Sequence, residues 1–252
     1  MAKSKKVSSK KVSRHEVADK LRSDQKRVDK RQGAVIIGVC ALIAIVIVGL
    51  AAYQPIKNWW DLRSYEDDAI ADIGASKSAC QDIITKKATG NQEHVKPGVN
   101  VDYDEAPPAF GAHEEYPDEM DRKLYTKDDR PNVEKLVHNL EHGYTILWYD
   151  ETAADDNEQM TEIRAIATKL KGTSNPRLKF KAVPWLKSDG KGFPDGQHIA
   201  LTHWSKGGHD VPISQVEKQV GVWQYCSKVS GEALDSFMKQ YDFFDSPEPR
   251  GM

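Results

Sequence analysis

The chain has 252 residues, a net charge of −2 and three cysteines. A mean hydropathy of −0.64 indicates that most of it is water-soluble. It contains no P-loop, no G-x-G-x-x-G and no G-x-S-x-G, so no motif supports a nucleotide-binding enzyme or an α/β-hydrolase.

The charge is unevenly distributed along the chain. Residues 1–32 contain twelve Lys and Arg against four Asp and Glu, a balance of +8, so the remainder carries −10. Gly33 to Ile56 follows with 24 uncharged residues, and about 20 apolar residues suffice for a helix to cross a bilayer. We therefore predict a basic cytoplasmic tail (1–32) and a single-pass transmembrane helix (33–56) in the lipid bilayer of the cell membrane, with the C-terminal part extracytoplasmic.

Two alternatives to this topology have less support from the sequence. A cleaved signal peptide has a shorter apolar region and a small-residue cleavage site, whereas this run is long and lacks a clear A-x-A exit. Nucleic-acid binding by the basic tail is possible from charge alone, but the tail lacks interleaved aromatic residues. A retained anchor, with no nucleic-acid partner, is the favoured interpretation.

The three cysteines are divided between the predicted membrane span and the part predicted to be exported. Cys40 lies within the apolar run, whereas Cys80 and Cys226 lie in the part predicted to be exported. Two cysteines in an oxidising compartment are most simply one disulfide. A redox-active or copper-binding pair is the alternative, although such pairs usually form a close C-x-x-C motif, which is absent here.

The rest of the chain predicts a juxtamembrane stalk (57–79), a globular domain (80–245) and an exposed tail (246–252). Hydrophobic periodicity and turn residues place elements in the domain. We expect helices at 131–142, 155–171, 214–224 and 230–244, and strands at 144–149, 178–183 and 197–204. This order predicts an α/β fold, a small mixed-sheet domain behind a single N-terminal transmembrane helix.

Histidines mark the candidate site. His138 and His142 are four residues apart on the predicted helix at 131–142, and one helical turn places them on the same face. His113, at the end of a long Pro- and Gly-rich segment, supplies a third candidate nitrogen. Three imidazoles suit copper or zinc, so His113, His138 and His142 are the candidate metal ligands.

A structural role for these residues is the alternative to metal binding. Glu141 faces an unfavourable dipole at the helix end and needs a local partner, such as His138 or a loop amide. Gly143 is a natural helix stop. In this interpretation Glu141, Gly143 and the histidines form a hydrogen-bonded network that fixes the long loop to the core.

A zinc peptidase is less well supported. His-x-x-Glu-His is a signature of such enzymes, but the helix here ends at the second histidine and a strand follows at once. His198, His203 and His209 form another group, for which packing or surface roles are expected. We therefore expect no catalytic residues, and enzymatic activity remains uncertain.

Three segments resemble a known family. PPAFGAH (107–113), VHNLEHGYTILWY (137–149) and HIALTHW (198–204) are similar to motifs of an actinobacterial family of membrane-anchored exported proteins, whose pattern includes P-P-T-S-G-x-H and V-H-x-L-E-H-G. The match covers roughly 80–245, and H-x-L-E-H-G is its most specific part. Ala109 and Phe110 depart from it, because they replace Thr and Ser.

Size, anchor and composition also resemble single-span accessory subunits of the corynebacterial cytochrome bcc–cytochrome oxidase supercomplex. This resemblance implies cytochrome bcc and cytochrome oxidase subunits as partners, a role in respiratory electron transport, and a copper-related function. Two function classes therefore stay open. The first is a membrane-anchored accessory or assembly subunit, and the second is an exported metal-dependent hydrolase or redox enzyme.

Overall fold

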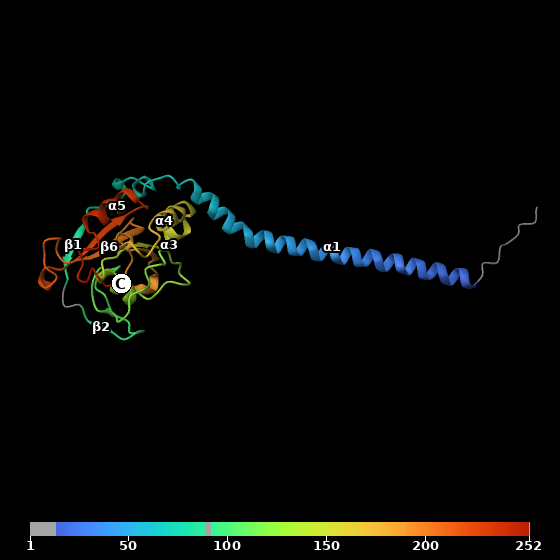
Figure 1. Cartoon of the computed structure of the whole chain (residues 1–252), viewed down its shortest axis with the longest axis horizontal. Helices are drawn as coiled ribbons and strands as arrows, with labels where there is room; N and C mark the ends of the chain where they lie inside the picture. The colour runs from blue at the N-terminus through green and yellow to red at the C-terminus, as the bar shows by residue number, and fades with distance from the viewer. Residues whose placement is uncertain (1–13, 89–91, 252) are drawn as a thin grey trace, which may run out of the picture. The chain divides into compact units, whose positions relative to one another are not determined.

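The computed structural model describes residues 14–88 and 92–251. It divides into two compact units that meet between Trp59 and Trp60. The described part of the first unit is helical, and the second unit is a mixed α/β domain built on a five-stranded sheet (Figure 1). The predicted fold class is confirmed.

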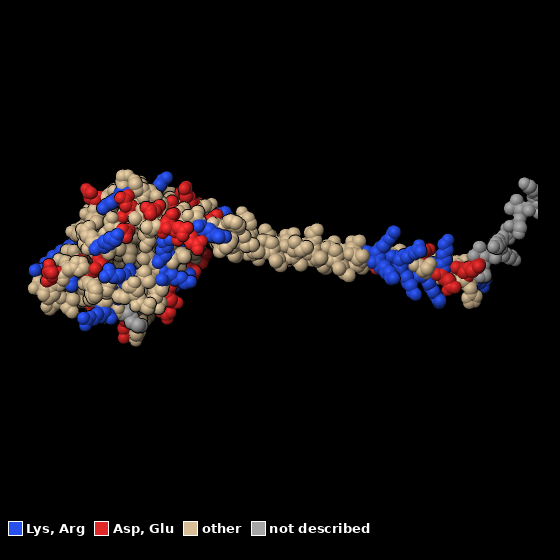
Figure 2. Space-filling view, turned by 45° about the horizontal axis from the view of Figure 1, so that its top comes forward, with Lys and Arg blue, Asp and Glu red and all other residues tan. Residues whose placement is uncertain are grey.

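A single long helix, α1, runs from Arg14 to Arg63. It contains an 18-residue window with a mean hydropathy of 3.1, none of it buried against protein, and is long and apolar enough to cross a membrane. Its basic side chains gather before the uncharged stretch (Figure 2). The predicted span at 33–56 lies inside this helix, whereas residues 1–13 of the predicted tail lie outside the described residues.

The central sheet of the second unit has the order β1-β7-β6-β4-β5. Strands β4 and β5 are parallel, and the other neighbours are antiparallel, so the sheet is mixed. The strands are β1 (Ile84–Lys87), β4 (Thr145–Tyr149), β5 (Phe180–Pro184), β6 (Ile199–Ser205) and β7 (Val220–Cys226). Helices α3 (Glu151–Asp155) and α4 (Asn157–Lys169) connect β4 to β5.

Both faces of the sheet are covered, because the side chains of a strand alternate between its two sides. Leu147 and Tyr149 pack in a cluster with residues of α4 and α5 (Gly231–Gln240). Ile146 and Trp148 pack in a second cluster with the apolar stripe of α2 (Val133–Glu141). Burial on both sides explains why β4 contains no charged residue and is mostly apolar or aromatic.

Two very short strands form a separate parallel pair, β2 (His94–Val95) and β3 (His113–Glu114). Neither is predicted from the sequence, because two residues are too few to show a period. The register places His94 opposite His113. This pair and α2 position the site described below.

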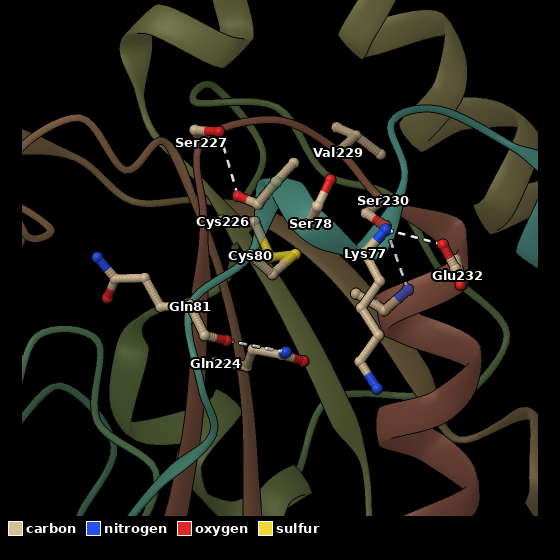
Figure 3. Close-up of a disulfide and its surroundings, with 12 residues drawn as sticks. Lys77, Ser78, Cys80, Gln81, Gln224, Cys226, Ser227, Val229, Ser230 and Glu232 are labelled. Carbon is tan, nitrogen blue, oxygen red and sulfur yellow. Dashed lines mark hydrogen bonds between the residues drawn. A yellow bond between two sulfur atoms is a disulfide. The ribbon is translucent and has the colours of Figure 1, made fainter.

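The disulfide joins Cys80 to Cys226, with 146 residues of sequence separation. It fixes the segment before β1 to the end of β7, where Gln224 donates to the carbonyl of Gln81 at 3.1 Å and Ser227 donates to that of Ala79 at 3.1 Å (Figure 3). The predicted pairing is confirmed. Cys40 is a free thiol on α1.

Three sequence-based expectations differ from the structure. The helix expected at 214–224 is a single 3-10 turn, η5 (Val216–Lys218), followed by β7. The expected stalk at 57–79 continues α1 to Arg63 and then enters the domain, where Ile73 is fully buried. Of the tail expected to be exposed at 246–252, Ser246 is fully buried and the amide of Glu248 donates to the carbonyl of Glu141 on α2, whereas residue 252 lies outside the described residues.

Candidate metal centre

Helix α2 contributes two side chains to the centre. Its buried residues include Val133, Leu136, Val137 and Leu140, an apolar stripe at helical spacing that holds the helix against the sheet. His138 and Glu141 are three residues apart and therefore neighbours on the helix surface. The chain then turns at Gly143, which has a φ of 85°. Helix, stop and following strand are as predicted.

The strand pair β2–β3 contributes the other two side chains. His94 and His113 are register partners, and their ring centroids are 4.8 Å apart. The ring of His138 lies 4.7 Å from that of His113 and 5.2 Å from that of His94. One potential ligand atom from each of His94, His113, His138 and Glu141 lies within 4.8 Å of all the others. We call these four residues the His3Glu cluster.

The cluster is buried except at one side. His113 and Glu141 are completely inaccessible to solvent and His138 is 4 % exposed, whereas His94 is exposed. A buried histidine or glutamate needs a partner, because burial of an unpaired polar group costs free energy. His94 is the member of the cluster that faces solvent.

The two buried histidines have a defined orientation. The Nδ1 atom of His113 lies 2.8 Å from the carbonyl oxygen of Gly111, and that of His138 lies 2.6 Å from the carbonyl oxygen of Glu114. Since a carbonyl only accepts, each Nδ1 carries the proton and donates it. In a neutral ring the Nε2 then has the free lone pair, which is how metal-binding histidines are commonly held.

The electrostatics of the cluster call for a cation. The Nε2 atom of His113 and Oε2 of Glu141 are 3.0 Å apart. The polar neighbours of the Glu141 carboxylate are His113 and Gln92, although no hydrogen bond of good geometry is formed to it or to this nitrogen among the described residues. An imidazole lone pair and a carboxylate repel each other at this distance unless a proton or a metal ion lies between them.

Two pKa shifts describe the same environment. Burial lowers the pKa of His138 to about 4, and the nearby His113 and His142 contribute, so His138 is a neutral ligand at pH 7. Burial alone would raise the pKa of Glu141, but His113, Gln92 and His138 outweigh it and hold that pKa below its usual value. A neutral imidazole and an ionised carboxylate are the forms that bind metals.

His142 is adjacent to the cluster rather than part of it. Its ring centroid is 4.6 Å from that of His138, but its potential ligand atom groups with those of Glu141 and Glu248. The predicted set of His113, His138 and His142 is thus brought together locally, while the structure puts His94 and Glu141 beside the first two. No sequence signal identified His94, because its proximity depends on pairing of two-residue strands.

His203 and the two residues that depart from the family pattern, Ala109 and Phe110, have packing roles. The ring of buried His203 lies between the carbonyl oxygens of Tyr144 and Asp245, and His198 pairs with Asp150. Ala109 is fully buried, and the ring of Phe110 packs against Trp204 and Trp223.

Comparison with known proteins adds a family. Residues 94–251 match the family described as protein of unknown function (DUF3105). The chain belongs to this family. No curated protein and no solved structure matches it. The DUF3105 match begins at His94 and ends at Gly251, so it includes the whole His3Glu cluster as well as Glu248.

Proposed function

We propose that the C-terminal domain binds a divalent transition-metal ion, zinc or copper(II), in the His3Glu cluster. The observation that supports this most is the fully buried pair of His113 and Glu141, whose potential ligand atoms lie within 4.8 Å of those of His94 and His138. Two donors that each lie about 2.0–2.1 Å from a zinc ion in a tetrahedral site are roughly 3.3 Å apart. The Nε2 to Oε2 distance of 3.0 Å is close to this value.

The donor set favours these two ions over others. Three imidazoles with one carboxylate suit zinc and copper(II), whereas copper(I) prefers thiolate and thioether sulfur. The two exported-domain cysteines are consumed by their disulfide. Four protein ligands also fill a tetrahedral zinc site, which is typical of a structural or holding site rather than a catalytic one.

This arrangement gives less support to a hydrolase. In His-x-x-Glu-His peptidases the glutamate acts as general base while both histidines bind the metal. Here Glu141 is in the ligand position and His142 belongs to the adjacent group. A metal-dependent hydrolase or redox enzyme remains the second candidate, and turnover abolished by a chelator would support it.

We further propose that the domain is anchored outside the cytoplasm and serves as an accessory or assembly subunit of a cytochrome bcc–cytochrome oxidase supercomplex. Three features support this: the long apolar helix, the basic residues before its uncharged stretch, and a disulfide of the kind that persists in oxidising compartments. The partners themselves rest on the sequence resemblance.

Metal content tests the first proposal. The full-length protein, purified in detergent and freed of metal, is dialysed against zinc and analysed by mass spectrometry, then titrated by calorimetry. We expect bound zinc, with affinity at least about tenfold lower in Glu141→Gln and His138→Ala, because each removes a ligand. His209→Ala is the control, since His209 is half-exposed and outside the cluster. Zinc binding equal in all four proteins would contradict the proposal.

Affinity purification from native membranes tests the second. We expect the tagged chain to co-purify with c-type and a-type haem, detected by difference spectra. Recovery of the chain without haem, at detergent conditions that keep the supercomplex intact, would contradict the accessory-subunit proposal but leave metal binding unaffected.

A further inference from the structure

Glu141 lies between two groups of metal-binding side chains. It completes the His3Glu cluster on one side, and with His142 and Glu248 it forms a second group whose ligand atoms also lie within 4.8 Å of one another. Its side chain is completely buried, and its Oε2 lies 3.0 Å from Nε2 of His113. One buried carboxylate thus contributes a potential ligand atom to each of the two groups.

The C-terminal segment brings Glu248 to this position. The backbone amide of Glu248 donates to the carbonyl of Glu141 at 2.9 Å, and the ring of His142 contacts the carbonyl of Glu248 through Nδ1 at 3.1 Å. The ammonium of buried Lys179 donates to the carbonyls of His142, Pro249 and Gly251 at 2.7–3.1 Å. The backbone around Glu248 is therefore fixed, although its side chain is 51 % exposed.

We propose that a second divalent metal ion binds between His142 and Glu248, and that Glu141 bridges it to the ion in the His3Glu cluster. This inference rests on the proposed metal-binding function and extends it to a carboxylate-bridged pair. Metal ions in such pairs are about 3.5–4 Å apart. The ring centroids of His138 and His142, one from each site, are 4.6 Å apart, so the two sites are adjacent.

The two sites differ in affinity and access. The second has three protein ligands, so a zinc ion there keeps a position for water or another ligand. It is also near the ammonium of Lys179, whose charge opposes a cation at His142. We therefore expect the second ion to bind more weakly and exchange faster than the first.

The test uses the full-length, metal-free protein in detergent, titrated with zinc by calorimetry and analysed for zinc after dialysis. We expect two zinc ions per chain, with the second binding at least about tenfold more weakly. Glu248→Gln and His142→Ala are expected to bind one ion with unchanged tight affinity. Glu217→Gln, at an exposed glutamate outside both groups, is expected to bind two. Copper(II) then tests whether the two sites are adjacent, because two bridged copper(II) ions couple magnetically and lose the electron paramagnetic resonance spectrum of a single copper(II) ion. Glu248→Gln should restore the spectrum of a single ion.

The outcomes separate this inference from the proposed function. A single zinc ion in the unchanged protein, lost in Glu141→Gln, would overturn the second site and leave the first. Two ions that persist in both Glu248→Gln and His142→Ala would place the second ion elsewhere and overturn the bridge. No zinc in any variant would overturn both. Glu248→Gln alters a half-exposed side chain, so it keeps the test decisive even if His142→Ala fails to fold.

Discussion

Gly143 joins α2 to β4 in a conformation that side chains disfavour. Its φ is 85°, and a Cβ atom there would overlap the backbone of Phe243. We expect Gly143→Ala to lower the free energy of unfolding by more than about 1 kcal/mol, measured by urea denaturation of the domain. Gly192→Ala is the matched control, because Gly192 has open space around it and no positive φ. Equal, small effects of both substitutions would contradict this explanation of the helix stop.

A second residue-scale prediction concerns Glu162 on α4. Burial raises its pKa to about 7, and the neighbouring Glu158 and Asp156 contribute. Since the folded state then holds a proton that the unfolded state has released, stability falls as the pH rises from about 4.5 to 7. Glu162→Gln removes this loss, so its thermal midpoint should exceed that of the unchanged protein at pH 8 and match it at pH 4. A midpoint difference independent of pH would rule out this origin.

At the scale of elements, the disulfide connects the segment before β1 to β7. It closes a loop across 146 residues of sequence and therefore lowers the conformational entropy of the unfolded chain. We expect replacement of Cys80 and Cys226 by serine to lower the free energy of unfolding by about 2–5 kcal/mol. Cys40→Ser is the control, because Cys40 lies on α1 outside the compact domain. Denaturation curves of the unchanged protein, the double serine variant and Cys40→Ser test this prediction. Coincident curves for all three would contradict it.

A comparison of two elements shows where the hydrophobic pattern of the sequence is sufficient to predict secondary structure. Helix α2 and strand β4 are close to their predicted bounds, because the apolar stripe, the glycine stop and the β-branched run are all local signals. The segment at 214–224 is apolar at several spacings, and this pattern predicts a helix. Pairing of β7 with both β1 and β6 decides in favour of a strand, because it satisfies backbone groups on both sides.

For the whole molecule, the uncharged part of α1 and the basic residues before it predict the orientation of the chain in the membrane. Protease added to intact spheroplasts should digest the C-terminal domain, followed with an antibody to the C-terminus. A cytoplasmic protein is the control for intact cells. Protection of the domain, with cleavage only after lysis, would reverse the proposed topology.

Metal removal is the second prediction at this scale. An ion that binds only the folded state stabilises it, by about 2.7 kcal/mol at a free concentration one hundred times the dissociation constant. A chelator should therefore lower the thermal midpoint of the unchanged protein. Addition of zinc should then restore that midpoint. His138→Ala should show a smaller response, and an identical response in both proteins would locate the metal outside the cluster.

The sequence by itself predicted the apolar helix and the mixed α/β class, because both depend on composition or local periodicity, and the disulfide partners, because only two cysteines lie outside the apolar run. The tertiary structure decided the composition of the candidate site. His94 reaches His113 only through a pair of two-residue strands, and Glu248 reaches His142 only because Lys179 holds the C-terminal segment in place. Such contacts between distant segments leave no periodic trace in a single sequence, since they are fixed by packing of the whole domain.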